Sequence, residues 1–172
     1  MTTIRPLRPD EAEVYVALRR EMLHDAPWAF SASPLPGDDR ACDAAHMRES
    51  LANPENIVVG AFEGGLLVAS VGVMRSPRAK FRHTAHIWGV YVTPQHRGKG
   101  LAREVMLAAI GTARAWPGVV CVRLSASARS TPARSLYDSL GFATWGIEPD
   151  YLRQPESPGE KGPDEHHMVL RF

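Results

Sequence analysis

One segment constrains the fold more than any other, because in it an extended apolar run passes through a basic, glycine-rich turn directly into a helix. The segment reads YVTPQHRGKGLAREVM and spans residues 91–106. Glycines in the turn leave backbone amides bare, and the first amides of a helix lie at the positive end of its dipole. The segment therefore predicts a strand–turn–helix unit of an α/β sheet whose turn can bind an anion.

The N-terminal part of the chain predicts a strand followed by two helices. TIRPLR is expected to be a strand, and Pro6 favours a place at the edge of the sheet. The first helix is expected to begin at Asp10 as its cap, with Glu13 three residues later. Its buried face is predicted to carry Val14, Leu18 and Met22. A second helix is predicted from about Asp39 to Leu51.

The remaining elements alternate between strands and helices. EGG separates two β-rich runs and predicts a hairpin, and residues 87–92 form a strand expected to be buried on both faces. The helix after the basic turn has one apolar face and ends at WPG, and a short helix is expected in TPARSLYDSLGF. Strands are expected in VVCVRLSAS, ATWGIE and HHMVLRF. The order predicts one mixed α/β domain over residues 1–172.

Composition excludes several classes of protein. The 20 Lys and Arg against 19 Asp and Glu leave a net charge of +1, which argues against a general nucleic-acid binder. No run approaches the roughly 20 apolar residues of a membrane span, and the N-terminus lacks the apolar core of a signal peptide, so we expect a cytoplasmic protein. Cys42 and Cys121 are isolated, as expected for reduced thiols rather than a disulfide or a metal site.

Three phosphate-binding patterns compete for the turn QHRGKG. A P-loop requires Ser or Thr after its lysine, but Lys99 is followed by Gly100. A dinucleotide-binding turn requires a third small residue where Arg103 stands. The pattern that fits is Gln/Arg-x-x-Gly-x-Gly/Ala, formed by Gln95, Gly98 and Gly100. Taken alone, these six residues are equally compatible with an ordinary strand–helix turn.

A second match extends this pattern. ARSLYDSLGF, residues 133–142, fits A-x-x-L-Y-x-x-x-G-F and follows one intervening strand. With the turn, it resembles the GNAT superfamily of acyl-CoA-dependent N-acyltransferases over about residues 87–142. The resemblance implies a central, mostly antiparallel sheet that is splayed between its fourth and fifth strands and flanked by helices. It also implies acetyl-CoA as co-substrate, and strands near the C-terminus that can pair in a homodimer.

The resemblance assigns coenzyme contacts to the fourth strand, the turn and the later helix. The pyrophosphate would lie on the turn and the pantetheine arm along the strand. Ser130 stands where the family often has asparagine. Gly89, inside the strand, indicates either a bulge or a packing gap. The implied contacts are Val90, Tyr91, Val92, Arg97, Gly98, Lys99, Gly100, Leu101, Ala102, Ser130, Ala133 and Tyr137.

The resemblance also implies the chemistry. An amine would attack the thioester directly, and Tyr137 would protonate the departing thiolate. For the base, Glu148, His86 and a chain of water molecules to bulk solvent stay open. The run DEHH at 164–167 is not expected to bind a metal, because consecutive strand residues point to opposite faces.

The acceptor is the least constrained part of the prediction. Trp28 and Phe30, in a proline-rich loop, are expected to wall an acceptor pocket, with Trp88 and Trp145 as further aromatic candidates. A small metabolite, a polyamine, an antibiotic, a peptide N-terminus and a protein lysine all stay open. The sequence thus predicts an acetyl-CoA-dependent N-acetyltransferase acting on a primary amine. The alternative is a non-catalytic acyl-CoA-binding sensor or regulatory module.

Overall fold

The computed structural model describes residues 1–33, 35, 38 and 40–172. One seven-stranded sheet runs through the molecule in the order β1-β2-β3-β4-β5-β7-β6, and the β4–β5 pair is parallel while the other neighbours are antiparallel. The strands are β1 (Thr2–Pro6), β2 (Asn56–Glu63), β3 (Leu66–Arg75), β4 (Thr84–Val92), β5 (Cys121–Ser127), β6 (Ala143–Glu148) and β7 (Glu165–Arg171). The mixed α/β sheet and the edge position of the first strand confirm the prediction.

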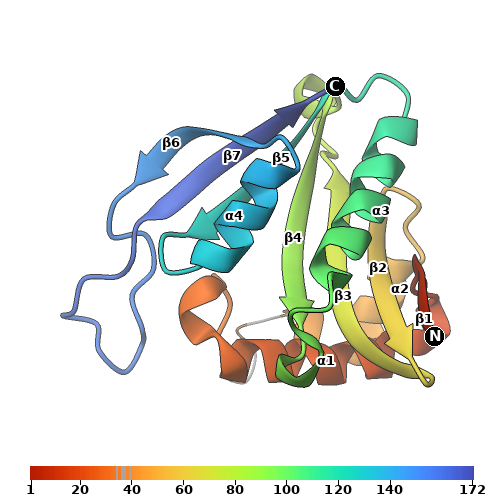
Figure 1. Ribbon diagram of the computed structural model, residues 1–172, viewed down its shortest axis with the longest axis horizontal. Helices are drawn as coiled ribbons and strands as arrows, with labels where there is room; N and C mark the ends of the chain where they lie inside the picture. Colours follow the sequence, from red (N-terminus) through yellow and green to blue (C-terminus); the bar gives the residue numbers. More distant parts are fainter. Residues whose placement is uncertain (34, 36–37, 39) are drawn as a thin grey trace.

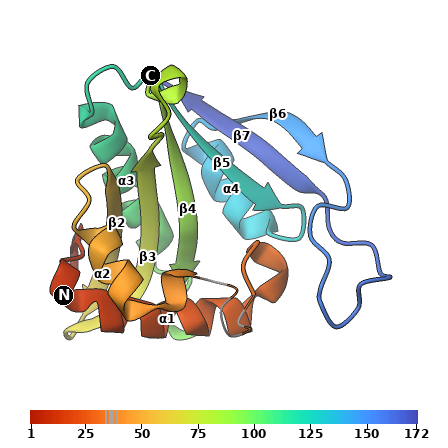
Figure 2. The same cartoon turned by 180° about the vertical axis from the view of Figure 1, so that it is seen from behind.

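Helices cover both faces of the sheet (Figures 1 and 2). The α-helices are α1 (Ala12–Asp25), α2 (Ala44–Leu51), α3 (Leu101–Ala115) and α4 (Thr131–Ser139). Short 3-10 turns are η1 (Pro9–Glu11), η2 (Pro27–Ala29), η3 (Arg40–Cys42), η4 (Ala79–Phe81) and η5 (Pro94–His96). One apolar cluster joins α3 and α4 to the sheet, and another joins α1 and α2 to the opposite face. The site therefore stands on a scaffold packed from two sides.

The predicted splay lies between β4 and β5. The two strands pair only where Thr84–His86 face Cys121–Arg123. Beyond His86 they diverge, as Figure 1 shows, and within the described chain the edge of β4 from Ile87 to Val92 has no β5 partner. Backbone groups on that edge are therefore available to a ligand.

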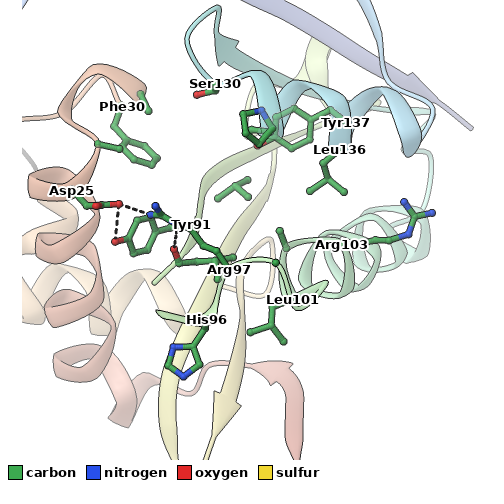
Figure 3. A pocket seen from close by; sticks show the side chains of 18 of the residues that line it. Asp25, Phe30, Tyr91, His96, Arg97, Leu101, Arg103, Ser130, Leu136 and Tyr137 are labelled. Carbon is green, nitrogen blue, oxygen red and sulfur yellow. Dashed lines mark hydrogen bonds and ion pairs between the residues drawn. The ribbon is translucent and has the colours of Figure 1, made fainter. Parts of the chain in front are cut away.

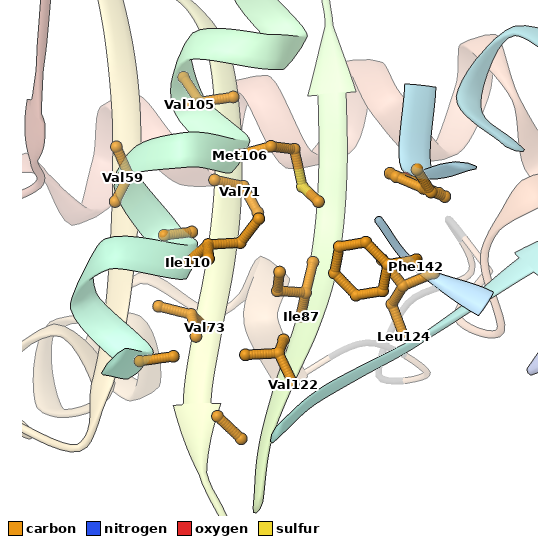
Figure 4. Packing of buried hydrophobic residues seen from close by; sticks show 14 of the residues in the cluster. Val59, Val71, Val73, Ile87, Val105, Met106, Ile110, Val122, Leu124 and Phe142 are labelled. Atoms are coloured by element: carbon orange, nitrogen blue, oxygen red, sulfur yellow. The ribbon is translucent and has the colours of Figure 1, made fainter. Parts of the chain in front are cut away.

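The apolar face of α3 anchors the helix that follows the basic turn. Val105, Met106 and Ile110 of α3 pack on Val71 and other residues of the sheet, as Figure 4 shows. Val105 and Met106 are fully buried. Each large buried side chain contributes about 1.5–3 kcal/mol, so the apolar face of α3 fixes the turn that precedes it.

The first two helices begin differently from the prediction. Asp10 does not cap α1; instead, a 3-10 turn precedes the helix, and the Glu11 carboxylate accepts from the Arg8 amide at 2.8 Å. Leu18 and Met22 are buried as expected, but Val14 is 47% exposed, because the buried face of α1 runs through Ala12, Tyr15 and Val16 at this end of the helix. The helix expected from Asp39, which lies outside the described residues, begins at Ala44, with Asp43 as its cap.

Two further expectations concern the strands. Gly64 and Gly65 both have positive φ, 57° and 86°, which confirms the hairpin turn. Gly89 has φ +60°, and the β3–β4 register shifts beside it between Ser70 and Gly72, which confirms the bulge. Residues 88–90 and 92 are only half-buried, so the expectation of a strand buried on both faces is wrong. The reason is that these residues line pockets in the splay.

Candidate active site

A pocket of about 630 Å³ opens where β4 leaves β5 (Figure 3). Its walls are the second half of β4, the turn into α3, the start of α4 and the loop after α1. Of the predicted coenzyme contacts, its lining includes Val90, Tyr91, Val92, Arg97, Gly98, Gly100, Leu101, Ala102, Ser130, Ala133 and Tyr137. Segments that are distant in the sequence therefore meet at one hollow, as the predicted site requires.

The turn before α3 has the conformation that an anion site needs. Gly98 and Gly100 have φ of 75° and 81°, a left-handed region that favours glycine. A Cβ built at either glycine would meet no described atom within 4 Å, so the backbone faces open space. Gly100 is the N-cap of α3 and has no side chain with which to cap it. Phosphate oxygens can therefore reach the amides at the helix start.

The two basic side chains of the turn are already paired with carboxylates. Arg97 forms an ion pair with Asp25 and donates from Nε to the Val92 carbonyl at 3.0 Å. The Lys99 Nζ lies 3.7 Å from Glu63 Oε2. Both side chains are about half exposed, at 50% and 51%. They add positive charge beside the turn, but a ligand must compete with the acidic partners.

Tyr137 forms part of the wall opposite the turn, as Figure 3 shows. It is 5% exposed, and its ring packs 6.1 Å from that of Phe142. Burial, and then the negative charge of Glu165, raise the pKa of the Tyr137 hydroxyl. Tyr137 is therefore protonated throughout the neutral range and can donate a proton. Ser130 precedes α4 and lines the pocket, but in the described structure its hydroxyl does not cap that helix.

A second pocket, of about 330 Å³, adjoins the first, and Ala29 and Phe30 line both. Its lining combines aromatic and ionisable side chains: Phe30, Trp88, Trp145, Tyr151, His86, Arg123, Glu165 and His167. The rings of Trp145 and His167 stack with centroids 5.5 Å apart. Burial, and then the charge of Arg123, lower the pKa of His86. This volume lies at the lower end of the range for ligand pockets.

The predicted acceptor and base residues differ in whether they line a pocket. Trp28 lines the first pocket only, whereas Phe30 lines both. The described residues that line the two pockets do not include Glu148, whose side chain is 55% exposed and lies 3.1 Å from His167 Nε2. His86 does line the second pocket.

Sequence reasoning did not single out Glu165 as a residue that lines a pocket. It is 5% exposed, lines the second pocket, and has its pKa raised to about 7, chiefly by burial. The alternation rule, applied to DEHH, placed neighbouring side chains on opposite faces but did not show which face carries Glu165 and His167. In the described part of the chain, no group of three or more His, Cys, Asp or Glu residues is arranged to hold a metal ion.

Comparisons with known proteins agree with this geometry. The model of the acetyltransferase (GNAT) family matches residues 18–142. N-alpha-acetyltransferase RimI of Mycobacterium tuberculosis is 36% identical over 118 residues, which cover 68% of this chain and 70% of RimI. Mycothiol acetyltransferase of Pseudarthrobacter chlorophenolicus is 32% identical over 72% of this chain, but the match spans only 38% of that protein.

Solved structures show the same fold. The GNAT-family acetyltransferase of Streptococcus pneumoniae superposes with a TM-score of 0.83 at 20% identity, covering 100% of this chain and 99% of that one. YncA of Salmonella typhimurium, whose structure includes its cofactor acetyl-CoA, gives 0.78 at 22% identity, with coverage of 99% and 94%.

The chain belongs to the GNAT acetyltransferase family, and it is an acetyl-CoA-dependent N-acetyltransferase. Among the helices that the structure describes, none combines the length and the apolar character needed to cross a membrane.

Proposed function

We propose that this enzyme moves the acetyl group of acetyl-CoA to a primary amine by direct attack, without a covalent enzyme intermediate. The observation that carries the proposal is the meeting of the two pockets at Ala29 and Phe30. One pocket has a helix start and a protonated tyrosine in its walls, and the other carries polar and aromatic groups. Two reactants held on either side of such a junction react faster, because binding has already brought them together.

The first pocket fits the coenzyme. The pyrophosphate would lie on the amides of the turn between Arg97 and Ala102, where the glycine backbone faces open space. The pantetheine arm would follow the free edge of β4 from Val90 to Val92 and bond to its backbone. Ser130 and Ala133, at the start of α4, would border the same ligand.

Tyr137 would be the general acid. Its hydroxyl stays protonated because burial raises its pKa, and it lines the pocket in which the thioester would lie. The CoA thiolate that leaves could therefore take the proton of this hydroxyl. A protein that only binds the coenzyme would need no proton donor beside the thioester, so the position of this hydroxyl supports catalysis.

For the acceptor, we favour an α-amino group of a peptide or protein. RimI, at 36% identity, is named for Nα-acetylation, and the second pocket is small enough to accept a chain terminus rather than a large metabolite. The amine of a small molecule is the other class, because mycothiol acetyltransferase is also a relative. Acetylation of the same peptide with a free and with a blocked N-terminus separates the two.

We also propose a cellular location and an oligomeric state for the enzyme. A cytoplasmic location fits the free thiols of Cys42 and Cys121. A homodimer through the outer strand β6 fits the exposure of Trp145 and Ile147, at 63% and 56%. Sedimentation of the wild type and of Ile147→Lys tests the dimer, which predicts a smaller species for the variant.

Thermal unfolding and a single substitution test the proposed function. Acetyl-CoA and CoA, but not ATP or NAD, should raise the unfolding midpoint, with about 2.7 kcal/mol of stabilisation at about a hundredfold Kd. Tyr137→Phe should lower kcat about 10²- to 10⁴-fold while leaving the Kd of acetyl-CoA nearly unchanged. Full turnover in this variant would refute the role of Tyr137. Midpoint shifts with ATP alone would refute the coenzyme site.

A further inference from the structure

Glu165 occupies a distinctive position in the sheet. It is the first residue of β7, and its register partners are Ser127 of β5 and Glu148 of β6. Ser127 ends β5 at the splayed side, where β4 and β5 are farthest from their point of pairing. Glu165 therefore lies at the end of the sheet where the two pockets meet, and not at the closed end.

The carboxylate of Glu165 is buried and incompletely bonded. The residue is 5% exposed, and its Oε2 has no hydrogen-bond partner among the described residues. A buried carboxylate oxygen left without a donor costs free energy, so native structures rarely keep one without a reason. Because Glu165 also lines the second pocket, a donor that enters this pocket would satisfy it. An amine is such a donor.

The surroundings of Glu165 raise its pKa into the range that is useful for proton transfer at neutral pH. Burial and the charge of Glu148 raise its pKa to about 7, against an opposing contribution from His167. A base with a pKa near neutrality is suited to an α-amino group, whose pKa is about 8, better than to a lysine, at about 10.4. The ionisable groups that line its pocket, neighbour it in the sheet or interact with its charge are Asp164, His166, His167, Glu148, Arg123, His86, Tyr137 and Tyr151.

The charge of Glu165 also acts on Tyr137, the proposed general acid. It raises the pKa of Tyr137, a residue of the first pocket, so the two groups lie near enough for their charges to interact. Because they line two adjoining pockets, an acid and a base placed in this way can serve the two ends of the same transfer. On this geometry, and resting on the proposed function, we infer that Glu165 is the general base that accepts the proton of the acceptor amine.

The proposed acetyl transfer conserves atoms and charge. Glu165 takes one proton from R–NH₃⁺, and the freed lone pair forms the C–N bond at the acetyl carbonyl carbon. The C–S bond breaks, and the thiolate takes the hydroxyl proton of Tyr137. The second N–H proton restores that hydroxyl, and Glu165 returns its proton to solvent. The products are the N-acetyl amine, CoA thiol and one proton.

Other ionisable groups fit this role less well. His86 pairs with Arg123 at the closed end of the splay, about 13 Å along the strand from Val90 at 3.3 Å per residue. His167 is engaged at both ring nitrogens, by Ser125 at 2.9 Å and Glu148 at 3.1 Å. These contacts tie His167 to Glu148, whose side chain is exposed, and leave no ring nitrogen free to accept a proton from the amine.

Three variants and one spectroscopic titration test the inference. Glu165→Gln keeps the shape and removes the charge, and Glu148→Gln does the same at the exposed acid. Glu49→Gln, on the exposed face of α2 and outside both pocket linings, is the matched control. Turnover is followed with a tripeptide bearing a free N-terminal alanine, as kcat/KM from about pH 5 to about pH 9. The Glu δ-carbon resonances are titrated by ¹³C NMR over the same range, and near-ultraviolet circular dichroism checks folding.

The inference predicts that Glu165→Gln lowers kcat/KM about 10²- to 10⁴-fold near neutrality and removes the acidic limb of the profile. The Kd of acetyl-CoA should change less than about threefold, because the coenzyme lies in the other pocket. The resonance missing from Glu165→Gln should titrate near 7 in the wild type. Glu49→Gln should match the wild type.

Either of two results overturns the inference. One is a Glu165→Gln enzyme that keeps both its rate and its acidic limb, especially if Glu148→Gln loses them. The other is a Glu165 resonance that titrates near the ordinary value of about 4.3. The titration requires no acceptor, so it decides the matter even if the tripeptide is not a substrate. Failure of the wild type to bind acetyl-CoA would instead overturn the proposed function.

Discussion

Gly100→Ala adds one methyl group at the residue that begins α3. Gly100 has φ 81° and ψ 0°, and the new Cβ would meet no described atom within 4 Å. Steric overlap with the protein therefore contributes nothing, and the cost is that of a left-handed non-glycine residue, about 1–2 kcal/mol. For a chain of this size, each kcal/mol lowers the unfolding midpoint by about 2–4 °C, so the expected loss is about 2–8 °C.

The same methyl group would point into the space assigned to the pyrophosphate. We expect the Kd of acetyl-CoA, measured by calorimetry, to rise at least tenfold, or about 1.4 kcal/mol. Gly111→Ala is the matched control, because Gly111 is exposed in the middle of α3 with no described atom near its Cβ position. It should stabilise the protein by about 0.4–1 kcal/mol and leave binding unchanged. Unchanged affinity in Gly100→Ala would refute the assignment of the turn.

Three further predictions concern charge and packing. The pKa of Glu11 falls to about 2, chiefly through its hydrogen bond with Arg5, so its contribution to stability is present above pH about 4.5 and lost as the pH falls toward 2. Urea denaturation should therefore show Glu11→Gln to be about 1–3 kcal/mol less stable at neutral pH, with the difference shrinking in acid; a constant difference contradicts this. Arg97→Ala should raise the Kd of acetyl-CoA only about three- to tenfold, with a weaker salt dependence, because Asp25 already holds the guanidinium; an unchanged affinity and salt dependence would make Arg97 purely structural. Met106→Ala, at a fully buried site, should lower the unfolding free energy by about 2–5 kcal/mol in the same urea assay, and a loss below about 1 kcal/mol would contradict the packing of α3.

Local patterns were sufficient to predict most of the fold. Glycine pairs and apolar periodicity are short-range signals, so the hairpin at Gly64 and Gly65 and the helix α3 followed from the residues themselves. The start of α1 was mispredicted because several acidic residues follow each other at 10, 11 and 13, and any of them can cap. In the structure Glu11 stands at the N-cap position, but its carboxylate accepts from the Arg8 amide and pairs with Arg5 at 2.6 Å instead of capping α1.

The residues that line the pockets were predictable where they belong to one continuous motif and not where distant segments must meet. The turn and the helix of Tyr137 are continuous motifs, and both line the predicted pocket. The pairing of Arg97 with Asp25 joins residues 72 positions apart, and no local pattern reveals it. Glu165 lines the second pocket only because the pairing of β5 with β7 brings it to the open end of the splay.

We propose above that acetyl-CoA binds between the turn before α3 and the start of α4. Titration of ¹⁵N-labelled protein with CoA tests it most directly, because every amide reports separately. We expect the largest shifts at Gly98, Gly100 and Leu101, with further shifts at Val90 and Val92 on the free edge of β4. Saturable shifts confined to another part of the sheet, with these amides unmoved, would contradict it.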